Sequence, residues 1–300
     1  MAHQFLICGR ECALPSGQSL FDHVFRSGKV PLAELDNHRG HTVHLLAEMN
    51  VPITEGLKFR EGGRTVQGLL EKGIEELYAP SPLEGRFEDA ELGWLLCAFA
   101  RYFPANARFI NRNGMSTGFL RLMTDVMTNN SFDKFSEAGT HELMGLSCGI
   151  QKLRGEVPAF SPELRPVLDW AETFLRTKIA RYLDNRDAQD DFQIPFLAYE
   201  KSRLLEGLGG PHSMQVAIGG HILTVIGMHY TRKEILADPR IVKAIERLLV
   251  HMEKLPGELL PLDPPGGGFT EVGVLGAYQR MSYAHAWEAL RLIREKLRGP

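Results

Sequence analysis

Hydrophobic positions recur every three or four residues along much of this chain. The spacing is clearest where charged residues separate the apolar ones, in segments 64–78, 163–183, 238–254 and 284–298. This period is typical of an amphipathic helix with one face packed and the other in water. Asp238 followed by Pro239 adds a start signal, because it places a capping side chain before a proline. No run of alternating β-branched residues appears, so we expect no sheet.

A second class of predicted helix is more apolar and richer in small residues. It comprises segments 90–103, 139–153 and 213–230. Helices of this composition are buried on nearly every side. The apolar and the amphipathic helices alternate along the chain, which is what a double ring needs: inner helices touch neighbours all round, whereas outer helices face water.

A weak repeat marks the apolar helices. A histidine follows or closely follows a small residue in each of four segments, at His41, His141, His221 and His285. In a fifth segment Glu91 takes the corresponding place. The markers are spaced 50, 50, 80 and 64 residues apart, so the two later repeats would carry insertions or an extra helix. Recurrence of one marker is typical of a helical-repeat architecture.

Alternating inner and outer helices with a small-residue and histidine marker resemble the α/α toroids of terpenoid cyclases, protein prenyltransferase subunits and six-hairpin carbohydrate enzymes. The resemblance implies an all-α chain that forms an α/α toroid of about five to six helix pairs around a central cavity. It covers most of the chain as architecture only. The aspartate-rich, glutamine-to-tryptophan and cysteine-histidine-glycine motifs of such families are missing, so no catalytic residue is carried over.

We expect one toroid domain over 1–300, with an irregular N-terminal segment over 1–35. A mobile loop rich in glycine and proline is expected over 256–282, since Pro264 and Pro265 precede three glycines. Loops at the mouth of a toroid supply substrate contacts, so Asp263 and Glu271 are candidate substrate-binding residues on a lid. The alternative is a plain surface linker.

Composition narrows the classes of partner. The chain has 300 residues, 44% apolar and 24% charged, with a formal net charge of −3. This balance gives no electrostatic footprint for nucleic acid. No apolar run approaches the ~18 residues of a membrane span. The four cysteines are scattered and no secretory leader is evident, so we expect a cytoplasmic protein and no membrane partner.

The histidine markers are the leading candidate for chemistry. If they lie at one height on their helices, His41, His141, His221 and His285 converge on one end of the cavity with Glu91. Imidazoles and a carboxylate in such a group would bind a divalent metal, zinc being the first choice. His44 lies on the same helical face as His41 and supports this interpretation. The alternatives are a polar pocket without metal, or histidines that share no site.

A pocket without metal could still be catalytic. His141, Glu142 and Glu91 would then serve as acid and base, for hydrolysis or lysis of a small organic or carbohydrate substrate. Trp94, Trp287 and Tyr283 would offer aromatic faces to that substrate, although aromatic residues at helical spacing are more often core.

Two other functions stay open at this stage. One is a non-catalytic helical-repeat protein that binds a partner on its concave face. The other is a carrier of a hydrophobic ligand, with a cavity lined by Met144, Leu223 and Trp287. The acidic run over 184–191 is interpreted as a solvated helix end, with a hard-cation site as the alternative.

Overall fold

The computed structural model describes residues 16–32, 40–76, 92–110, 116–128, 136–160, 164–185, 191–192, 210–261 and 271–299. The chain divides into two compact units, Met1–Leu175 and Arg176–Pro300, here called the N-terminal unit and the C-terminal unit. Each unit is described by itself. The expected single domain stays a prediction.

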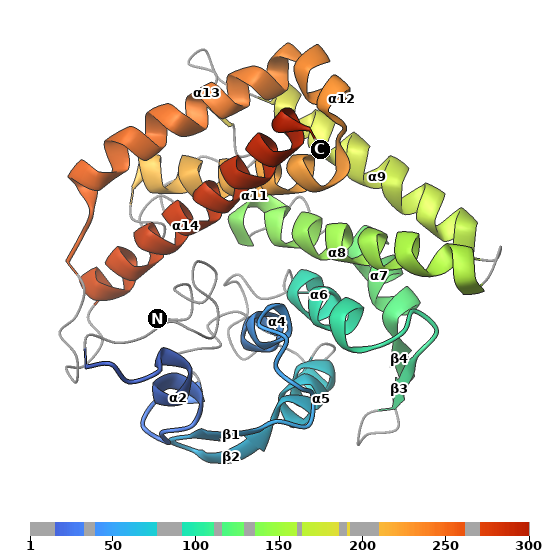
Figure 1. The fold of residues 1–300 in the computed structure, drawn as a ribbon, viewed down its shortest axis with the longest axis vertical. Coiled ribbons are helices and arrows are strands. Elements are labelled where there is room, and N and C mark those ends of the chain that lie inside the picture. Colours follow the sequence, from blue (N-terminus) through green and yellow to red (C-terminus); the bar gives the residue numbers. More distant parts are fainter. Residues whose placement is uncertain are drawn as a thin grey trace. The chain divides into compact units, whose positions relative to one another are not determined.

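The described residues are mostly helical, which confirms the all-α expectation. The N-terminal unit contains α2 (Leu20–Phe25), α4 (His41–Glu48), α5 (Val66–Glu76), α6 (Leu92–Tyr102), α7 (Phe119–Thr128) and α8 (Ser136–Phe160) (Figure 1). Helix α9 (Arg165–Asp184) crosses the boundary between the units. The C-terminal unit contains α11 (Pro211–His229), α12 (Arg232–Ala237), α13 (Pro239–Lys254), the 3-10 helix η4 (Leu255–Glu258) and α14 (Glu271–Arg298). No described helix combines the length and the apolar content needed to cross a membrane.

The expectation of no sheet is wrong, because the N-terminal unit has two antiparallel hairpins. Strand β1 (Gly56–Phe59) pairs with β2 (Gly62–Thr65), and β3 (Arg108–Ile110) pairs with β4 (Ser116–Gly118). Strands of three or four residues are too short to produce a recognisable alternation. In the first hairpin a two-residue loop joins the strands, and Gly62 has a φ of 123°, which favours glycine.

The segments expected to be irregular contain helices. Helix α2 lies within 1–35, where Ser19 accepts a hydrogen bond from the backbone N–H of Asp22 and caps it. Its Phe25 ring packs edge-on against Phe59, with centroids 6.4 Å apart. These contacts stabilise a helix of six residues that has little stability of its own.

Helix α14 begins at Glu271, so the expected loop over 256–282 is helical from that residue onwards. The buried side chain of Gln279 holds this part of the helix in place. It accepts a hydrogen bond from the backbone N–H of Leu260 and donates one to the carbonyl oxygen of Glu258. The helix start therefore depends on a contact with the preceding segment, which local composition does not reveal.

The apolar helices of the N-terminal unit run parallel to one another. At the start of α4 Gly40 lies against Leu95 of α6, and at its end Glu48 is bonded to Arg101. Likewise, Gly93 of α6 meets His141 of α8, and further along Cys97 contacts the carbonyl oxygen of Met144. Helices α5 and α7 lie between these three in the sequence and pack against them.

Glycine allows α6 and α8 to touch through their backbones. A Cβ on Gly93 would lie 2.1 Å from the carbonyl oxygen of His141, and a Cβ on Gly145 would lie 2.3 Å from the Cα of Gly93. Carbon and oxygen atoms do not approach so closely without a clash. The contact therefore requires glycine at both positions, and it brings Trp94, next to Gly93, up to His141.

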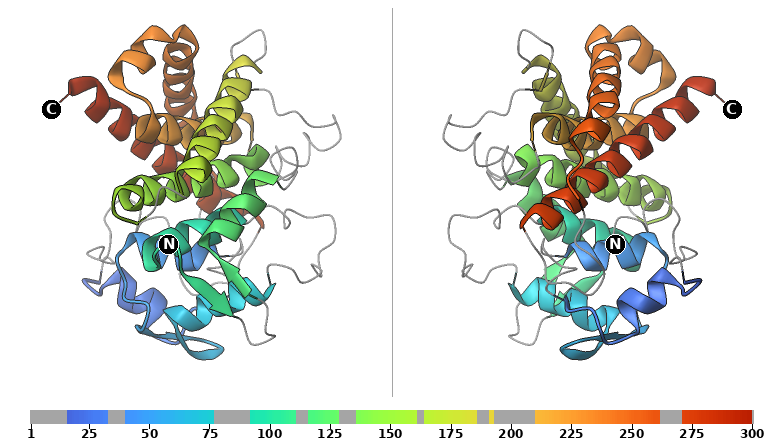
Figure 2. Two further views of the ribbon diagram at one scale, coloured as in Figure 1. Left: turned by 90° about the vertical axis from the view of Figure 1, so that its right-hand side faces the viewer. Right: turned by 90° about the vertical axis from the view of Figure 1, so that its left-hand side faces the viewer.

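Helices α11 and α14 pack against each other in the C-terminal unit, and α14 is the red helix in Figure 2. Gly220 lies against Ala286, and seven residues later Gly227 lies against Leu292. Because both contacts advance in the same direction, the two helices run parallel. A Cβ on Gly220 would lie 2.9 Å from the backbone nitrogen of Ala286, so this contact is also tight.

Helix α13 packs on α11 in the opposite direction. His212 at the start of α11 meets His251 near the end of α13, and Gly219 further along meets Leu248. Helix α13 begins as expected, since Asp238 caps it through the backbone N–H of Arg240 and Pro239 takes the first turn.

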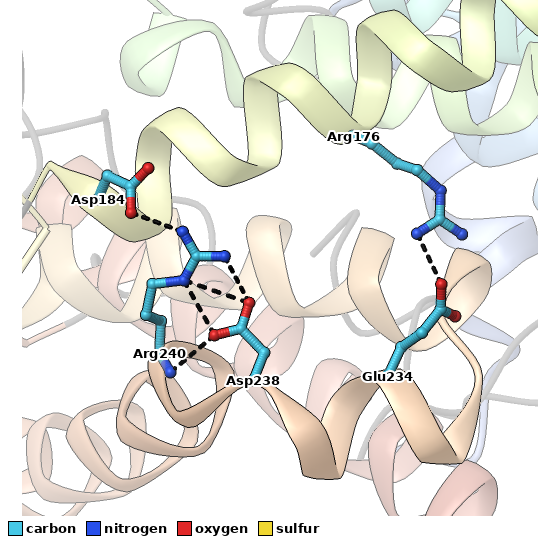
Figure 3. A network of polar contacts seen from close by, with 5 residues as sticks. All are labelled: Arg176, Asp184, Glu234, Asp238 and Arg240. Atoms are coloured by element: carbon cyan, nitrogen blue, oxygen red, sulfur yellow. Dashed lines mark hydrogen bonds and ion pairs between the residues drawn. The ribbon is translucent and has the colours of Figure 1, made fainter.

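Ion pairs connect the C-terminal half of α9 to α12 and α13 (Figure 3). Arg176 donates to Glu234 at 2.9 Å, and Arg240 donates to both Asp184 and Asp238. These side chains are partly exposed, so each pair contributes little to stability.

Candidate functional site

Four aromatic rings of the N-terminal unit meet in one group, which we call the core histidine cluster: His41, His44, Trp94 and His141. The Trp94 ring lies at the centre, with centroid distances of 5.0 Å to His41, 4.7 Å to His44 and 4.6 Å to His141. The rings come from α4, α6 and α8, three helices that are far apart in the sequence. Glu142 follows His141 directly on α8.

Close helix packing places these rings. Gly40 has a φ of 76° and begins α4, so the helix starts at His41 and presents His41 and His44 one turn apart. The backbone contact at Gly93 then brings Trp94 between α4 and α8. The cluster is thus a product of helix spacing rather than of any local sequence motif.

The cluster is buried. His44 retains 6% of its exposure, His141 retains 2% and Glu142 retains none. Burying ionisable groups opposes folding unless they are compensated, so an ordinary core would use apolar side chains at these positions. Departures from that rule gather at functional sites. Imidazole and carboxyl groups can donate and accept protons, so the cluster has the parts for acid–base chemistry.

The predicted catalytic residues are only partly described. His141 is a member of the cluster and Glu142 follows it on α8, whereas Glu91 lies outside the described residues. Trp94, expected to bind substrate, is the central ring and is 2% exposed. The sequence indicated His44 as well, because its i, i+3 spacing from His41 places both on one helical face.

The other two marker histidines meet in the C-terminal unit. The rings of His221 on α11 and His285 on α14 have centroids 4.5 Å apart, close to the tight contact at Gly220. The four markers thus form two pairs, one in each unit. Convergence of both pairs on one cavity stays a prediction.

The remaining predicted substrate-binding residues do not form a described site. Trp287 is 60% exposed on α14, and Tyr283 is partly buried one turn earlier. Asp263 and the side chain of Glu271 lie outside the described residues.

The zinc prediction also stays open. Among the residues that the structure describes, no three histidine, cysteine or carboxylate side chains are placed to hold a metal ion together.

Sequence reasoning missed a second polar group, in the C-terminal unit, which we call the histidine–aspartate chain. His212 and His251 are joined by a hydrogen bond of 2.7 Å between their Nδ1 atoms. His251 Nε2 is 2.8 Å from Asp191 Oδ1, and Arg247 Nε donates to the same oxygen at 2.9 Å. Glu258 Oε1 lies 3.4 Å from His212 Nε2 at the other end.

The members of this chain come from separate segments. His212 is in the first turn of α11, Arg247 and His251 are one turn apart on α13, and Glu258 ends η4. Asp191 belongs to the acidic run over 184–191, for which a solvated helix end is expected. For Asp191 that expectation is wrong, because its carboxyl group is hydrogen-bonded to Arg247 and His251. The separation of 39 residues between the two histidines gave no signal in the sequence.

Burial and hydrogen bonding set the charge states of His251 and Asp191 in the histidine–aspartate chain. Burial disfavours the charged form of His251 and lowers its pKa, by more than the hydrogen bond to Asp191 raises it. Burial also opposes ionisation of Asp191, but hydrogen bonds from His251 and Arg247 outweigh it and hold the pKa of Asp191 below its ordinary value. A neutral His251 therefore sits beside an ionised Asp191 at neutral pH.

A cysteine pair lies between α6 and α8. Burial and a hydrogen bond with Cys148 raise the pKa of Cys97 well above its ordinary value. A thiol that stays protonated is a weak nucleophile, so Cys97 is not a candidate catalytic nucleophile.

Comparison of the chain with protein-family models, with curated proteins and with solved structures gave no match.

Proposed function

We propose that this protein is an enzyme that performs acid–base chemistry on a small organic or carbohydrate substrate, with the core histidine cluster as its site. The observation that carries the proposal is the contact of one buried indole with three imidazoles from α4 and α8, with the buried residue Glu142 next to His141 in the sequence of α8. These are the same helices that the repeat marks.

Each residue has a role that its chemistry allows. His141 and Glu142 act as the acid and the base, because both can exchange a proton within the buried setting of α8. Trp94 is 2% exposed and contacts three imidazoles, so its role is to position them. His41 and His44 on α4 have ring nitrogens that donate or accept hydrogen bonds with polar substituents of the substrate.

We further propose the closed α/α toroid as the architecture of the site. Neighbouring apolar helices run parallel in each unit, while α13 runs antiparallel to α11, and this is the local geometry of inner helices backed by outer ones. In a closed ring the pair His221 and His285, together with Glu91, would face the same cavity as the core histidine cluster. Zinc assistance remains a separate prediction, tested by elemental analysis of protein purified without a histidine tag.

Ligand-induced thermal stabilisation tests the function. A panel of sugars, small hydroxy compounds, polyprenyl compounds and divalent metals is screened against the full chain, since a ligand of the folded state raises its melting temperature. We expect a sugar or a small polar organic molecule to raise it. The same compound is then incubated with the protein, and its turnover is followed by mass spectrometry over the pH range that titrates histidine.

Matched variants locate the effect. His141→Gln and Glu142→Gln keep the side-chain size and remove the proton transfer, so we expect turnover to fall by about 10²-fold while the ligand still binds. His23→Gln, on α2 and outside the cluster, is the control and should behave as wild type. Stabilisation by polyprenyl compounds alone, or turnover unchanged in both cluster variants, would contradict the proposal.

A further inference from the structure

The C-terminal unit carries a second constellation that the proposed function does not use, the histidine–aspartate chain. We propose that this chain is a separate acid–base site, in which His212 Nε2 removes a proton from a hydroxyl group while His251 and Asp191 fix its protonation state. The inference does not depend on the core histidine cluster, since all its residues belong to the other unit.

Asp191 determines which ring nitrogen of His251 carries a proton. An ionised Asp191 can only accept hydrogen bonds, and Arg247 already donates to its Oδ1. The contact of 2.8 Å from His251 Nε2 to the same oxygen is shorter than the 3.4 Å from that nitrogen to Arg247 Nη2, so the nitrogen bonds to the carboxylate and carries a proton. Neutral His251 carries one ring proton only, so its Nδ1 is an acceptor.

The second proton follows from the first. His251 Nδ1 and His212 Nδ1 lie 2.7 Å apart, and two unprotonated nitrogens at that distance would repel each other. His212 must therefore donate from Nδ1. In its neutral form His212 then has an unprotonated Nε2, which is the atom that a general base needs. Asp191 thus sets the tautomer of His251, and His251 sets that of His212, in the way that a carboxylate selects a histidine tautomer in a catalytic triad.

Access distinguishes the outer imidazole from the inner one. The side chain of His212 is 20% exposed, whereas that of His251 is 5% exposed. His212 is thus the member of the pair that a substrate can reach. Glu258 Oε1, 3.4 Å from Nε2, stands where it stabilises His212 once that imidazole has gained a proton.

A contact between Gln215 of α11 and Phe192 fixes the position of Asp191 relative to α11. Gln215, buried one turn after His212, accepts a hydrogen bond from the backbone N–H of Phe192 at 3.0 Å and donates to its carbonyl oxygen at 2.9 Å. This two-bond contact fixes the backbone next to Asp191. Helix α11 therefore positions both end residues of the histidine–aspartate chain. It carries His212 itself, and it holds Asp191 through Phe192.

The substrate class is set by what an imidazole base can do. His212 Nε2 takes the proton from a water or alcohol hydroxyl while that oxygen forms a bond to an electrophilic carbonyl carbon. The same proton then passes from Nε2 to the oxygen of the leaving group as its bond to carbon breaks. For an ester and water the products are a carboxylic acid and an alcohol, so atoms and protons balance without a further reactant. His212 is the catalytic residue, and His251, Asp191 and Gln215 are positioning residues.

Nitrogen NMR tests the positioning directly. In the full-length protein labelled with ¹⁵N-histidine, long-range proton–nitrogen spectra distinguish protonated from unprotonated ring nitrogens. In the neutral form of each ring we expect Nδ1–H and bare Nε2 for His212, and Nε2–H and bare Nδ1 for His251. In Asp191→Asn the amide can donate as well as accept, so the single tautomer of His251 should be lost. Asp184→Asn, which removes a carboxylate of the same unit outside the chain, should leave both tautomers unchanged.

Hydrolysis of p-nitrophenyl acetate tests the chemistry. We expect His212→Gln to lower the rate constant at neutral pH by about tenfold or more, and Asp191→Asn to lower it while changing the pH profile, with Asp184→Asn at the wild-type rate. Melting curves confirm that each variant is folded. A proton on His212 Nε2 in the wild-type protein overturns the inference, and so does hydrolysis that is unaffected by His212→Gln in a folded variant. Failure of this test leaves the proposal for the core histidine cluster unaffected, because none of its residues is changed.

Discussion

The two units hold their imidazoles in different ways. In the N-terminal unit the three rings of the core histidine cluster contact Trp94, and ring packing fixes their position. In the C-terminal unit directed hydrogen bonds run from Asp191 through His251 to His212, and they fix the protons as well. Ring contacts depend on volume, whereas the chain depends on charge and tautomer. The two constellations should therefore respond to different substitutions.

The largest effect is expected where volume matters most, at Trp94. Replacement by alanine removes the ring that three imidazoles contact and leaves a buried cavity, so Trp94→Ala should lower the free energy of unfolding by about 3–5 kcal/mol. Trp287→Ala is the matched control, because that ring is 60% exposed and should cost less than about 0.5 kcal/mol. Urea denaturation measures both. Equal losses at the two positions would show that the cluster is not the packed centre described above.

A slightly smaller loss is expected from the glycines that set the helix spacing. In Gly93→Ala the new Cβ would meet the carbonyl oxygen of His141 at 2.1 Å, and backbone atoms cannot move aside as a side chain does. We expect a loss of about 3 kcal/mol, and less in Gly220→Ala, where the nearest atom is 2.9 Å away.

Gly155→Ala is the control for both glycine variants. It lies in α8 with open space around the new Cβ and should be stabilising by up to about 1 kcal/mol, since alanine is the better helix former. A Gly93→Ala protein as stable as Gly155→Ala would contradict the close backbone contact between α6 and α8.

The response to acid should distinguish the histidine–aspartate chain. The pKa of His251 is lowered in the folded protein from an ordinary value of 6.5, and that of Asp191 is lowered from 3.8. The unfolded chain therefore binds protons more readily, so this stability is complete above about pH 6.5 and is lost as the pH falls through the folded pKa of His251, then of Asp191. In His251→Gln we expect the free energy of unfolding to fall less steeply as the pH drops below about 6.5. Urea denaturation at successive pH values measures this slope. A wild-type slope retained in the variant would assign the acid response to other groups.

The smallest effects are expected at the ion pairs of α9, α12 and α13. Asp184 is 63% exposed at its side chain, so Asp184→Asn should cost less than about 0.5 kcal/mol. Asp238→Ala should cost more, about 1 kcal/mol, because Asp238 also caps α13 through the backbone N–H of Arg240. A thermal melt of both variants compares them. The reverse order would mean that the link from α9 to α13 matters more than the cap.

Periodicity alone predicted the main helices. The amphipathic segment over 238–254 became α13 with the expected cap at Asp238. The apolar segments became α6 and α11 with ends within two residues of those expected, and α8, which extends beyond the expected segment at both ends. These features are local: a helix period, a capping side chain and a proline act over one or two turns. The repeat marker likewise identified His41 and His141, which do meet through Trp94.

Contacts between distant segments decided the rest. The short strands around Gly62, the helical start of α14 held by Gln279, and the hydrogen bond between His212 and His251 all depend on partners that no local pattern identifies. A side chain's charge state and tautomer depend on burial and on the atoms that face it, and both exist only after the chain has folded. The sequence alone therefore determined the long periodic helices, whereas the tertiary structure decided the short helix α2, the start of α14 and which histidines can work together.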